Sequence, residues 1–176
     1  MEDLRYPIGN FAYPGTLTAA GRDACITRIA AAPAKVRAAV TDLSGTQIDT
    51  PYRPGGWTVR QVVHHLPDSH LNAYTRFHLA LTETTPTIRP YEEALWAELS
   101  DGRSAPVEFS LDLLDALHAR WVFLLRRLGT EDWSRAFIHP GHGREMTLDE
   151  TLAMYAWHGE HHVAHITSLR TRMGWT

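Results

Sequence analysis

Four histidines lie within eight residues near the C-terminal end of this chain: His158, His161, His162 and His165. The surrounding stretch has the pattern of an uninterrupted helix, in which residues four apart stand one turn above the other on the same face. Two neutral imidazoles at that spacing can bind a single transition metal ion. The spacing therefore predicts a metal site, although it does not name a reaction.

Helical phase separates these histidines. At about 100° per residue, three of them fall on the face that is expected to point into a helical bundle: His158, His162 and His165. His161 falls at the edge of that face, and Glu160 is predicted to point to solvent. Gly159 stands directly after the first histidine, where a zinc-protease helix carries its glutamate base. The pattern therefore disfavours a peptidase.

A third metal ligand is expected from a facing helix. The helix predicted to follow Thr58 carries four further histidines: His64, His65, His70 and His78. Its apolar periodicity puts His70 near the centre of the core face and His65 at the border, although Pro67 makes the phase less regular. Beside the core runs a polar stripe: His65, Ser69, Asn72 and Arg76. This stripe is either a solvated face or the wall of a cleft beside a metal.

The remaining histidines lack convincing ligand spacing. His118 stands among leucines and is expected to be a hydrogen-bonded core residue, whereas His139 and His142 lie in a Gly/Pro loop and are expected to be exposed. The sequence has no Gly-x-Ser-x-Gly elbow and no phosphate-binding glycine loop. Metal binding thus remains the main chemical prediction.

Four long helices with little strand signal predict an all-α four-helix bundle. Their expected extents are Leu17 to Leu43, Thr58 to Glu83, the residues after Ser110 as far as Gly129, and Thr147 to Met173. Two capping boxes are predicted, Thr58 with Gln61 and Thr147 with Glu150. Pro33 should kink or divide the first helix.

The connections also carry a prediction. Residues 45–56 read as a turn-rich link, and residues 133–146 as a small hairpin or an ordered loop. The link between the second and third helices is long, with a possible short helix in residues 91–100. A connection of that length can cross the bundle and leave two consecutive helices parallel.

Composition limits the class of protein. The chain has 176 residues, expected to form one domain over residues 1–176, and a net charge of −3 with no basic block, which argues against a nucleic-acid partner. No stretch is apolar enough for a membrane span, and the N-terminus lacks the features of a secretion signal. Cys25 is the single cysteine, so metal ligands should be imidazoles or carboxylates. We expect a soluble cytoplasmic protein without a membrane partner.

Several segments together closely resemble one family. They are YPIG at residues 6–9, PYRPGGWTVRQVVHHL at 51–66, DSH at 68–70, IRPY at 88–91, WHGEHHVAHI at 157–166 and RMGW at 172–175. This set is similar to the YfiT branch of the DinB superfamily, and the resemblance covers nearly the whole chain. It implies an up-down-down-up four-helix bundle with one divalent metal per chain, often zinc or nickel.

The resemblance also implies a ligand set. Carried over position by position, the three metal-binding histidines correspond to His65, His158 and His162. The resemblance thus selects His65 where periodicity favours His70, and Pro67 departs from the ordinary helix former expected at its position. The roles of His70, His161 and His165 stay open.

Such a site leaves coordination positions open, as catalytic metal sites do. The resemblance implies a metal-dependent hydrolase that activates water for attack on a small-molecule substrate. The alternatives are a transferase that conjugates a low-molecular-weight thiol such as bacillithiol to an electrophile, and a metal-binding stress protein without turnover. Position alone suggests Arg76 for an anionic substrate group, and His161 or Asp68 for handling a proton. Similar proteins form homodimers, so a homodimer is a further possibility.

Overall fold

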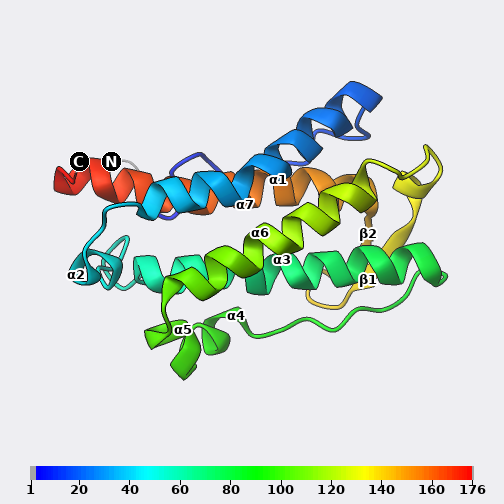
Figure 1. The fold of residues 1–176 in the computed structure, drawn as a ribbon. Helices are drawn as coiled ribbons and strands as arrows, with labels where there is room; N and C mark the ends of the chain where they lie inside the picture. The colour runs from blue at the N-terminus through cyan, green and yellow to red at the C-terminus, as the bar shows by residue number, and fades with distance from the viewer. Residues whose placement is uncertain (1–2, 176) are drawn as a thin grey trace.

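The computed structural model describes residues 3–175, in which four long helices form a bundle (Figure 1). They are α1 (Ala19–Val40), α3 (Val59–Thr82), α6 (Val107–Leu125) and α7 (Leu148–Met173). Followed along the chain, α1 and α7 run in one direction, and α3 and α6 run in the other. The predicted all-α, up-down-down-up bundle is therefore confirmed.

Short elements fill the connections. They are α2 (Gly45–Ile48), α4 (Glu93–Trp96), α5 (Ser100–Ser104), the 3₁₀ turn η1 (Asp132–Ser134), β1 (Ala136–His139) and β2 (Arg144–Thr147). The link from α3 returns along the bundle through α4 and α5, so that α6 starts at the same end as α3 (Figure 1). The antiparallel pairing of β1 with β2 confirms the predicted hairpin. The turn predicted at residues 45–48 is instead a short helix, because Ser44 and Gln47 form a capping box there.

Two prolines lie inside long helices without dividing them. α1 continues through Pro33 and α3 through Pro67. A proline has no N–H, so the carbonyl four residues earlier loses its helical hydrogen bond. At Pro33 that carbonyl belongs to Ile29, and it accepts a hydrogen bond from His118 Nδ1 on α6 at 2.7 Å. A side chain from another helix thus replaces the lost bond.

The third long helix begins and ends earlier than predicted. It starts at Val107 and not after Ser110, and it ends at Leu125 before Gly129 is reached. Ser110 therefore lies inside the helix and does not cap it, and its hydroxyl contacts His64 Nδ1 at 2.7 Å. Pro106 precedes the first turn, where its missing N–H costs no helical bond.

Of the two predicted capping boxes, one is complete. Thr58 and Gln61 bond to each other's backbone N–H groups at the start of α3. At the start of α7, the Thr147 hydroxyl accepts from the Glu150 N–H at 3.1 Å. The Glu150 carboxylate, however, binds the Arg144 guanidinium at 2.5 and 2.8 Å. The second box is therefore only half formed.

The bundle has two hydrophobic clusters with a layer of histidines between them. One cluster includes Phe77 and Trp121, and the other includes Leu66, Leu114 and Ile166. On α3, α6 and α7 the change from one cluster to the other falls at buried or half-buried histidines, which are His65, His70, His118, His158, His162 and His165. A polar layer thus crosses an otherwise apolar interior.

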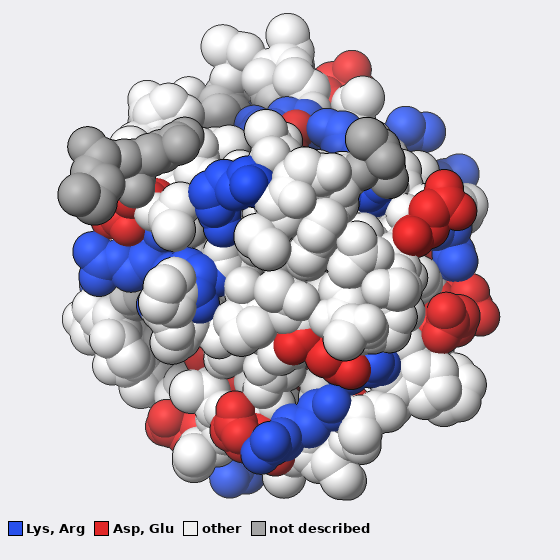
Figure 2. Space-filling model, turned by 90° about the vertical axis from the view of Figure 1, so that its left-hand side faces the viewer, with Lys and Arg blue, Asp and Glu red and all other residues white. Residues whose placement is uncertain are grey.

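The exterior carries charges of both signs. On the end of the molecule shown in Figure 2, basic and acidic side chains are interspersed, and neither sign forms a continuous patch. This distribution agrees with the small net charge of −3. Within residues 3–175, no helix is both long and apolar enough to cross a membrane.

Candidate metal centre

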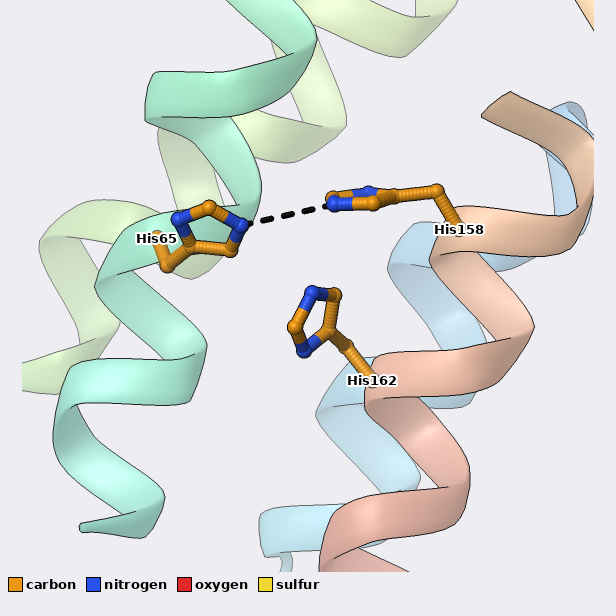
Figure 3. Close-up of side chains that lie close together, drawn as sticks. All are labelled: His65, His158 and His162. Carbon is orange, nitrogen blue, oxygen red and sulfur yellow. Dashed lines mark hydrogen bonds between the residues drawn. The ribbon is translucent and has the colours of Figure 1, made fainter. Parts of the chain in front are cut away.

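Three histidines from two helices converge at one end of the polar layer. His65 on α3 faces His158 and His162, which stand one turn apart on α7 (Figure 3). One ring nitrogen from each lies within 4.8 Å of the others, and the Nε2 atoms of His65 and His158 are 3.4 Å apart. A tetrahedral ion with metal–nitrogen bonds of about 2.0–2.1 Å separates its ligands by about 3.4 Å. The three side chains therefore fit a single metal ion.

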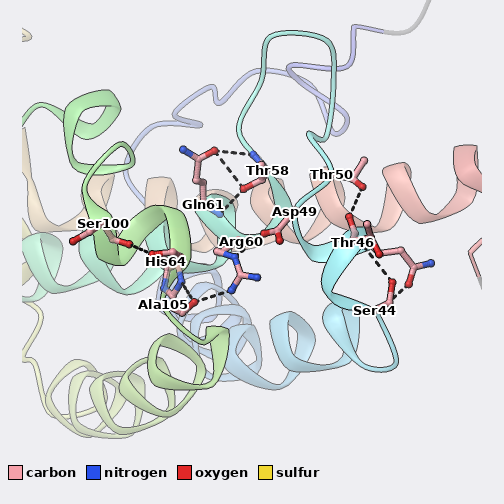
Figure 4. Close-up of polar contacts among 12 residues, drawn as sticks. Ser44, Thr46, Asp49, Thr50, Thr58, Arg60, Gln61, His64, Ser100 and Ala105 are labelled. Carbon is pink, nitrogen blue, oxygen red and sulfur yellow. Dashed lines mark hydrogen bonds and ion pairs between the residues drawn. The ribbon is translucent and has the colours of Figure 1, made fainter.

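The first turns of α3 are held so that adjacent histidines serve different purposes. Arg60 donates to Asp49 Oδ1 at 2.7 Å and to the Ala105 carbonyl at 2.8 Å. His64 Nε2 bonds to the same carbonyl at 3.1 Å (Figure 4). These contacts fix the start of α3 against α2 and the α5–α6 link. His64 is therefore structural, whereas its neighbour His65 is left to face α7.

His70, which periodicity favours as the third ligand, lies outside the cluster. Its Nε2 contacts His158 Nδ1 at 3.0 Å, and its Nδ1 contacts His118 Nε2 at 2.8 Å. Both of its ring nitrogens are therefore occupied by other histidines. The choice of His65 over His70, which the resemblance implies, agrees with this geometry: the border of the core face is the position that faces α7.

His165 and the N-terminal segment close the other side of the cluster. The Nδ1 atom of His165 lies 3.3 Å from His162 Nδ1, and its Nε2 donates to the Arg5 carbonyl at 3.0 Å. The ring of Tyr52 stacks on His165 with 4.0 Å between centroids. Residues far apart in the sequence thus enclose the histidines of α7.

The three histidines of the cluster are uncharged near neutral pH. Burial lowers the pKa of His65 to about 4, with smaller contributions from His165 and His161. Burial also holds the pKa values of His158 and His162 well below the ordinary histidine value. The three imidazoles are consequently neutral near pH 7, and each keeps a lone pair that a metal can use.

Two cavities meet at His158. The first, of about 440 Å³, is lined by His65, His158 and His162, which we call the metal-type cluster, together with Arg5, Arg53 and Trp57 among others. The second, of about 250 Å³, is lined by residues that include Ser69, Arg76, Tyr91, His139 and Tyr155. Both cavities also include Glu93 in their walls. A ligand could therefore approach His158 from two sides.

The three residues suggested for other catalytic roles lie in different places in the structure. His161 lines the first cavity, stacked on Trp157 with 4.3 Å between ring centroids, and burial lowers its pKa to about 4. Arg76 is buried in the wall of the second cavity. Asp68 lines neither cavity; burial, and then Asp101, raise its pKa to about 6.

The polar stripe on α3 is largely buried, so it is not a solvated face. Ser69 and Arg76 line the second cavity and His65 the first, as the cleft-wall interpretation requires. His139, expected to be exposed, is half-buried in the second cavity, whereas His142 is exposed at its edge.

On α7, Glu160 is partly exposed, as expected for the outer side of the helix, but it also contacts a neighbouring helix. Its carboxylate pairs with Arg28 at 2.6 Å and with Lys35 at 2.9 Å, both on α1. The helical wheel placed Glu160 on the outer side of α7, but α1 packs beside that side and supplies the two cations.

Glu93 is the residue that sequence reasoning missed. It stands at the start of α4, in the crossover between α3 and α6, and it lines both cavities. No periodicity connects it with the histidines, because only the path of the crossover brings α4 to the metal-type cluster. A short helix was expected in this segment, but no role was predicted for its side chains.

The fold and this cluster together define a class: a four-helix-bundle protein with a three-histidine site beside a cavity. A family model for the DinB superfamily matches residues 28–166, and the chain belongs to that superfamily. Proteins of Bacillus mycoides and Bacillus cereus, each named "Putative metal-dependent hydrolase", are 55% identical over 175 residues, which is 99% of this chain and 100% of theirs.

A solved structure agrees with both the fold and the resemblance. YfiT from Bacillus subtilis, described as "a probable metal-dependent hydrolase with an unusual four-helix bundle topology", matches with a TM-score of 0.96 at 50% identity. The match covers 98% of this chain and 99% of that one. The resemblance to the YfiT branch is thus confirmed.

Proposed function

We propose that this protein is a metal-dependent hydrolase in which His65, His158 and His162 bind one divalent ion, zinc or nickel. The observation that carries the proposal is the convergence of three neutral imidazoles beside a cavity of about 440 Å³. The names of the Bacillus relatives support it. When bound, such an ion supplies Lewis-acid chemistry that activates water and polarises an electrophile.

Arg76 is assigned to an anionic group of the substrate. Its side chain is buried and, within residues 3–175, makes no hydrogen bond or ion pair. The buried Tyr91 hydroxyl and His139 Nδ1 in the same cavity also lack hydrogen-bond partners in the described chain. A carboxylate or phosphate oxygen would satisfy all three groups.

Glu93 and His161 are assigned to the proton that leaves the attacking water. Both line the first cavity, whereas Asp68 does not. Glu93 is the one acidic side chain that lines either of these two cavities within residues 3–175. We expect Glu93→Gln to lower kcat with little change in bound metal, since the amide cannot accept a proton at neutral pH.

Elemental analysis tests the metal site. Protein purified without a histidine tag should contain nearly one equivalent of metal, and His65→Ala, His158→Ala and His162→Ala should each lose it. His78→Ala is the matched control, because His78 is an exposed histidine on the same helix as His65. Full metal content in all three ligand variants would contradict the assignment.

A substrate panel tests the reaction class. Metal-loaded protein is given activated esters and amides, with and without a small thiol such as bacillithiol. Thiol-independent hydrolysis that disappears in His158→Ala supports the proposal. Turnover only with thiol would instead establish a transferase, and the absence of turnover in fully loaded protein would leave metal binding as the function.

A further inference from the structure

The polar layer contains more histidines than a three-ligand site needs. His70, His118 and His165 are buried in the layer, and each makes a hydrogen bond to another histidine. Together they form two chains of imidazoles. Each chain begins at a backbone carbonyl and ends at a histidine of the metal-type cluster.

The first chain crosses the bundle from α1 to α7. The Ile29 carbonyl can only accept, so His118 must carry its proton on Nδ1, 2.7 Å away. A neutral His118 then accepts at Nε2 from His70 Nδ1–H at 2.8 Å, and His70 accepts at Nε2 from His158 Nδ1–H at 3.0 Å. The proton of His158 is thereby held on Nδ1, and its Nε2 keeps the lone pair that faces His65.

The origin of this chain is visible in the sequence. The Ile29 carbonyl is available because Pro33 has no N–H to donate to it. The proline inside α1 therefore creates the acceptor that sets the direction of the three following hydrogen bonds.

The second chain is shorter and follows the same logic. The Arg5 carbonyl requires the proton of His165 to lie on Nε2, at 3.0 Å. His165 then accepts at Nδ1 from the Nδ1–H of His162, at 3.3 Å. His162 is consequently left with its lone pair on Nε2, the nitrogen that points toward His65 and His158 in Figure 3.

We propose that His70, His118 and His165 are positioning residues that select the tautomer and ring orientation of two metal ligands, His158 and His162. The inference rests on the proposed metal site. Burial keeps the pKa values of His70 and His118 below the ordinary value, which agrees with one proton per ring. Because both chains begin at carbonyls, which do not take up a proton, they hold the ligands and do not conduct protons away from the site.

The groups hydrogen-bonded behind His158 and His162 are neutral imidazoles, and these chains lead to backbone carbonyls. Many other metal-binding histidines have a carboxylate as this partner. No negative charge is therefore placed behind the ligands by either chain. We expect the bound ion to keep more of its positive charge, and so to be a stronger Lewis acid, than it would with carboxylate partners.

Nitrogen NMR tests the tautomers without metal or activity. In metal-free protein with ¹⁵N-labelled histidine at pH 7.5, long-range ¹H–¹⁵N correlation should show the protons of His70, His118, His158 and His162 on Nδ1. The proton of His165 should lie on Nε2. A proton found mainly on Nε2 of His158 or His162 would overturn the proposal.

Zinc affinity, measured by competition with a chelator, tests the effect on the site. His118→Phe and His165→Phe should bind zinc about 10–100-fold more weakly than the wild type. His118→Gln should recover part of the loss, because an amide offers both a donor and an acceptor. His78→Phe, on the exposed side of α3, is the control that should bind as the wild type does.

The outcomes separate the two proposals. Unchanged affinity in folded His118→Phe and His165→Phe, judged by circular dichroism, would refute the positioning role while leaving the metal site intact. A wild type that binds no zinc or nickel would refute the metal site, and the NMR experiment would still decide whether the two chains have the stated direction.

Discussion

At the scale of single residues, this protein keeps many ionisable side chains neutral or unpaired inside its bundle. Burial lowers the pKa of His65 and of His161 to about 4. Arg76 is buried without an ion pair in the described chain. Below about pH 6.5 the two imidazoles lower the stability of the metal-free protein, and all three side chains line the two cavities, as the perturbed groups of functional sites often do.

The first prediction concerns the pH dependence of stability. The folded pKa of His65, about 4, is below the unfolded value of about 6.5, so the unfolded chain binds more protons between these pH values. The unfolding free energy, as far as His65 determines it, is therefore highest above pH 6.5. It falls as the pH decreases and levels off below about pH 4. His65 alone should cost about 2 kcal/mol of unfolding free energy between pH 6.5 and 5.

Urea denaturation of metal-free protein at a series of pH values measures this dependence. In His65→Gln, the unfolding free energy should change less steeply with pH than it does in the wild type. His78→Gln serves as the control for the loss of an imidazole. Identical slopes for the wild type and His65→Gln would show that His65 does not carry this linkage.

The second prediction concerns Arg76. Arg76→Met should leave the unfolding free energy within about 1 kcal/mol of the wild type, because the guanidinium faces the cavity and makes no hydrogen bond or ion pair in the described chain that the substitution would remove. The same variant should keep its metal but raise the KM for anionic substrates. A loss of stability together with unchanged KM would mean that Arg76 is structural.

At the scale of elements, the close approach of α1 to α7 explains Gly159, which stands at the position where a zinc-protease helix carries its glutamate base. A Cβ atom at Gly159 would lie 3.2 Å from the Ala32 side chain and 3.8 Å from the His70 ring. A larger residue at this position would push α1 away from α7 beside His158. The glycine therefore sets the helix spacing on which the metal-type cluster depends.

The third prediction tests this spacing. Gly159→Val should lower the unfolding free energy by about 1–3 kcal/mol through overpacking, and should weaken zinc binding through the displacement of α7. Gly45→Val is the matched control, because a Cβ at Gly45 has no neighbour within 4 Å. Thermal denaturation and chelator competition provide the two measurements; a wild-type result in both would refute the packing role.

At the scale of the whole molecule, the metal-type cluster joins α3 to α7 in the layer where the hydrophobic core is interrupted. Apolar packing stabilises the bundle on either side of this layer, whereas the layer itself depends on hydrogen bonds between histidines. A bound ion would add a link between two helices at the place where the apolar core contributes least.

The fourth prediction concerns metal removal. An ion that binds only the folded state at 100 times its Kd stabilises it by about 2.7 kcal/mol. For a chain of this size, that corresponds to an increase of about 5–10 °C in Tm. Zinc added to chelator-treated protein should produce this shift, whereas Mg²⁺, which prefers oxygen ligands, should not. The shift should disappear in His158→Ala; its persistence there would place the ion elsewhere.

What the sequence determined by itself is local. Apolar spacing predicted four helices, Thr58 with Gln61 predicted the start of α3, and the spacing of His158 and His162 predicted a shared helical face. These features depend on residues within one or two turns of each other, so the pattern contains all the information they need. The resemblance added the choice of His65 and the order of the helices.

Tertiary structure decided which distant groups meet. Ser110 lies inside α6, where its hydroxyl bonds to His64, and Glu93 reaches the cavities because the crossover passes beside them. His70 lies between two other helices: its Nε2 contacts Nδ1 of His158 on α7, and its Nδ1 contacts Nε2 of His118 on α6. Helical period fixes the face on which a side chain stands but not the partner it meets, since partners come from other elements and their contacts exist only after the helices have packed.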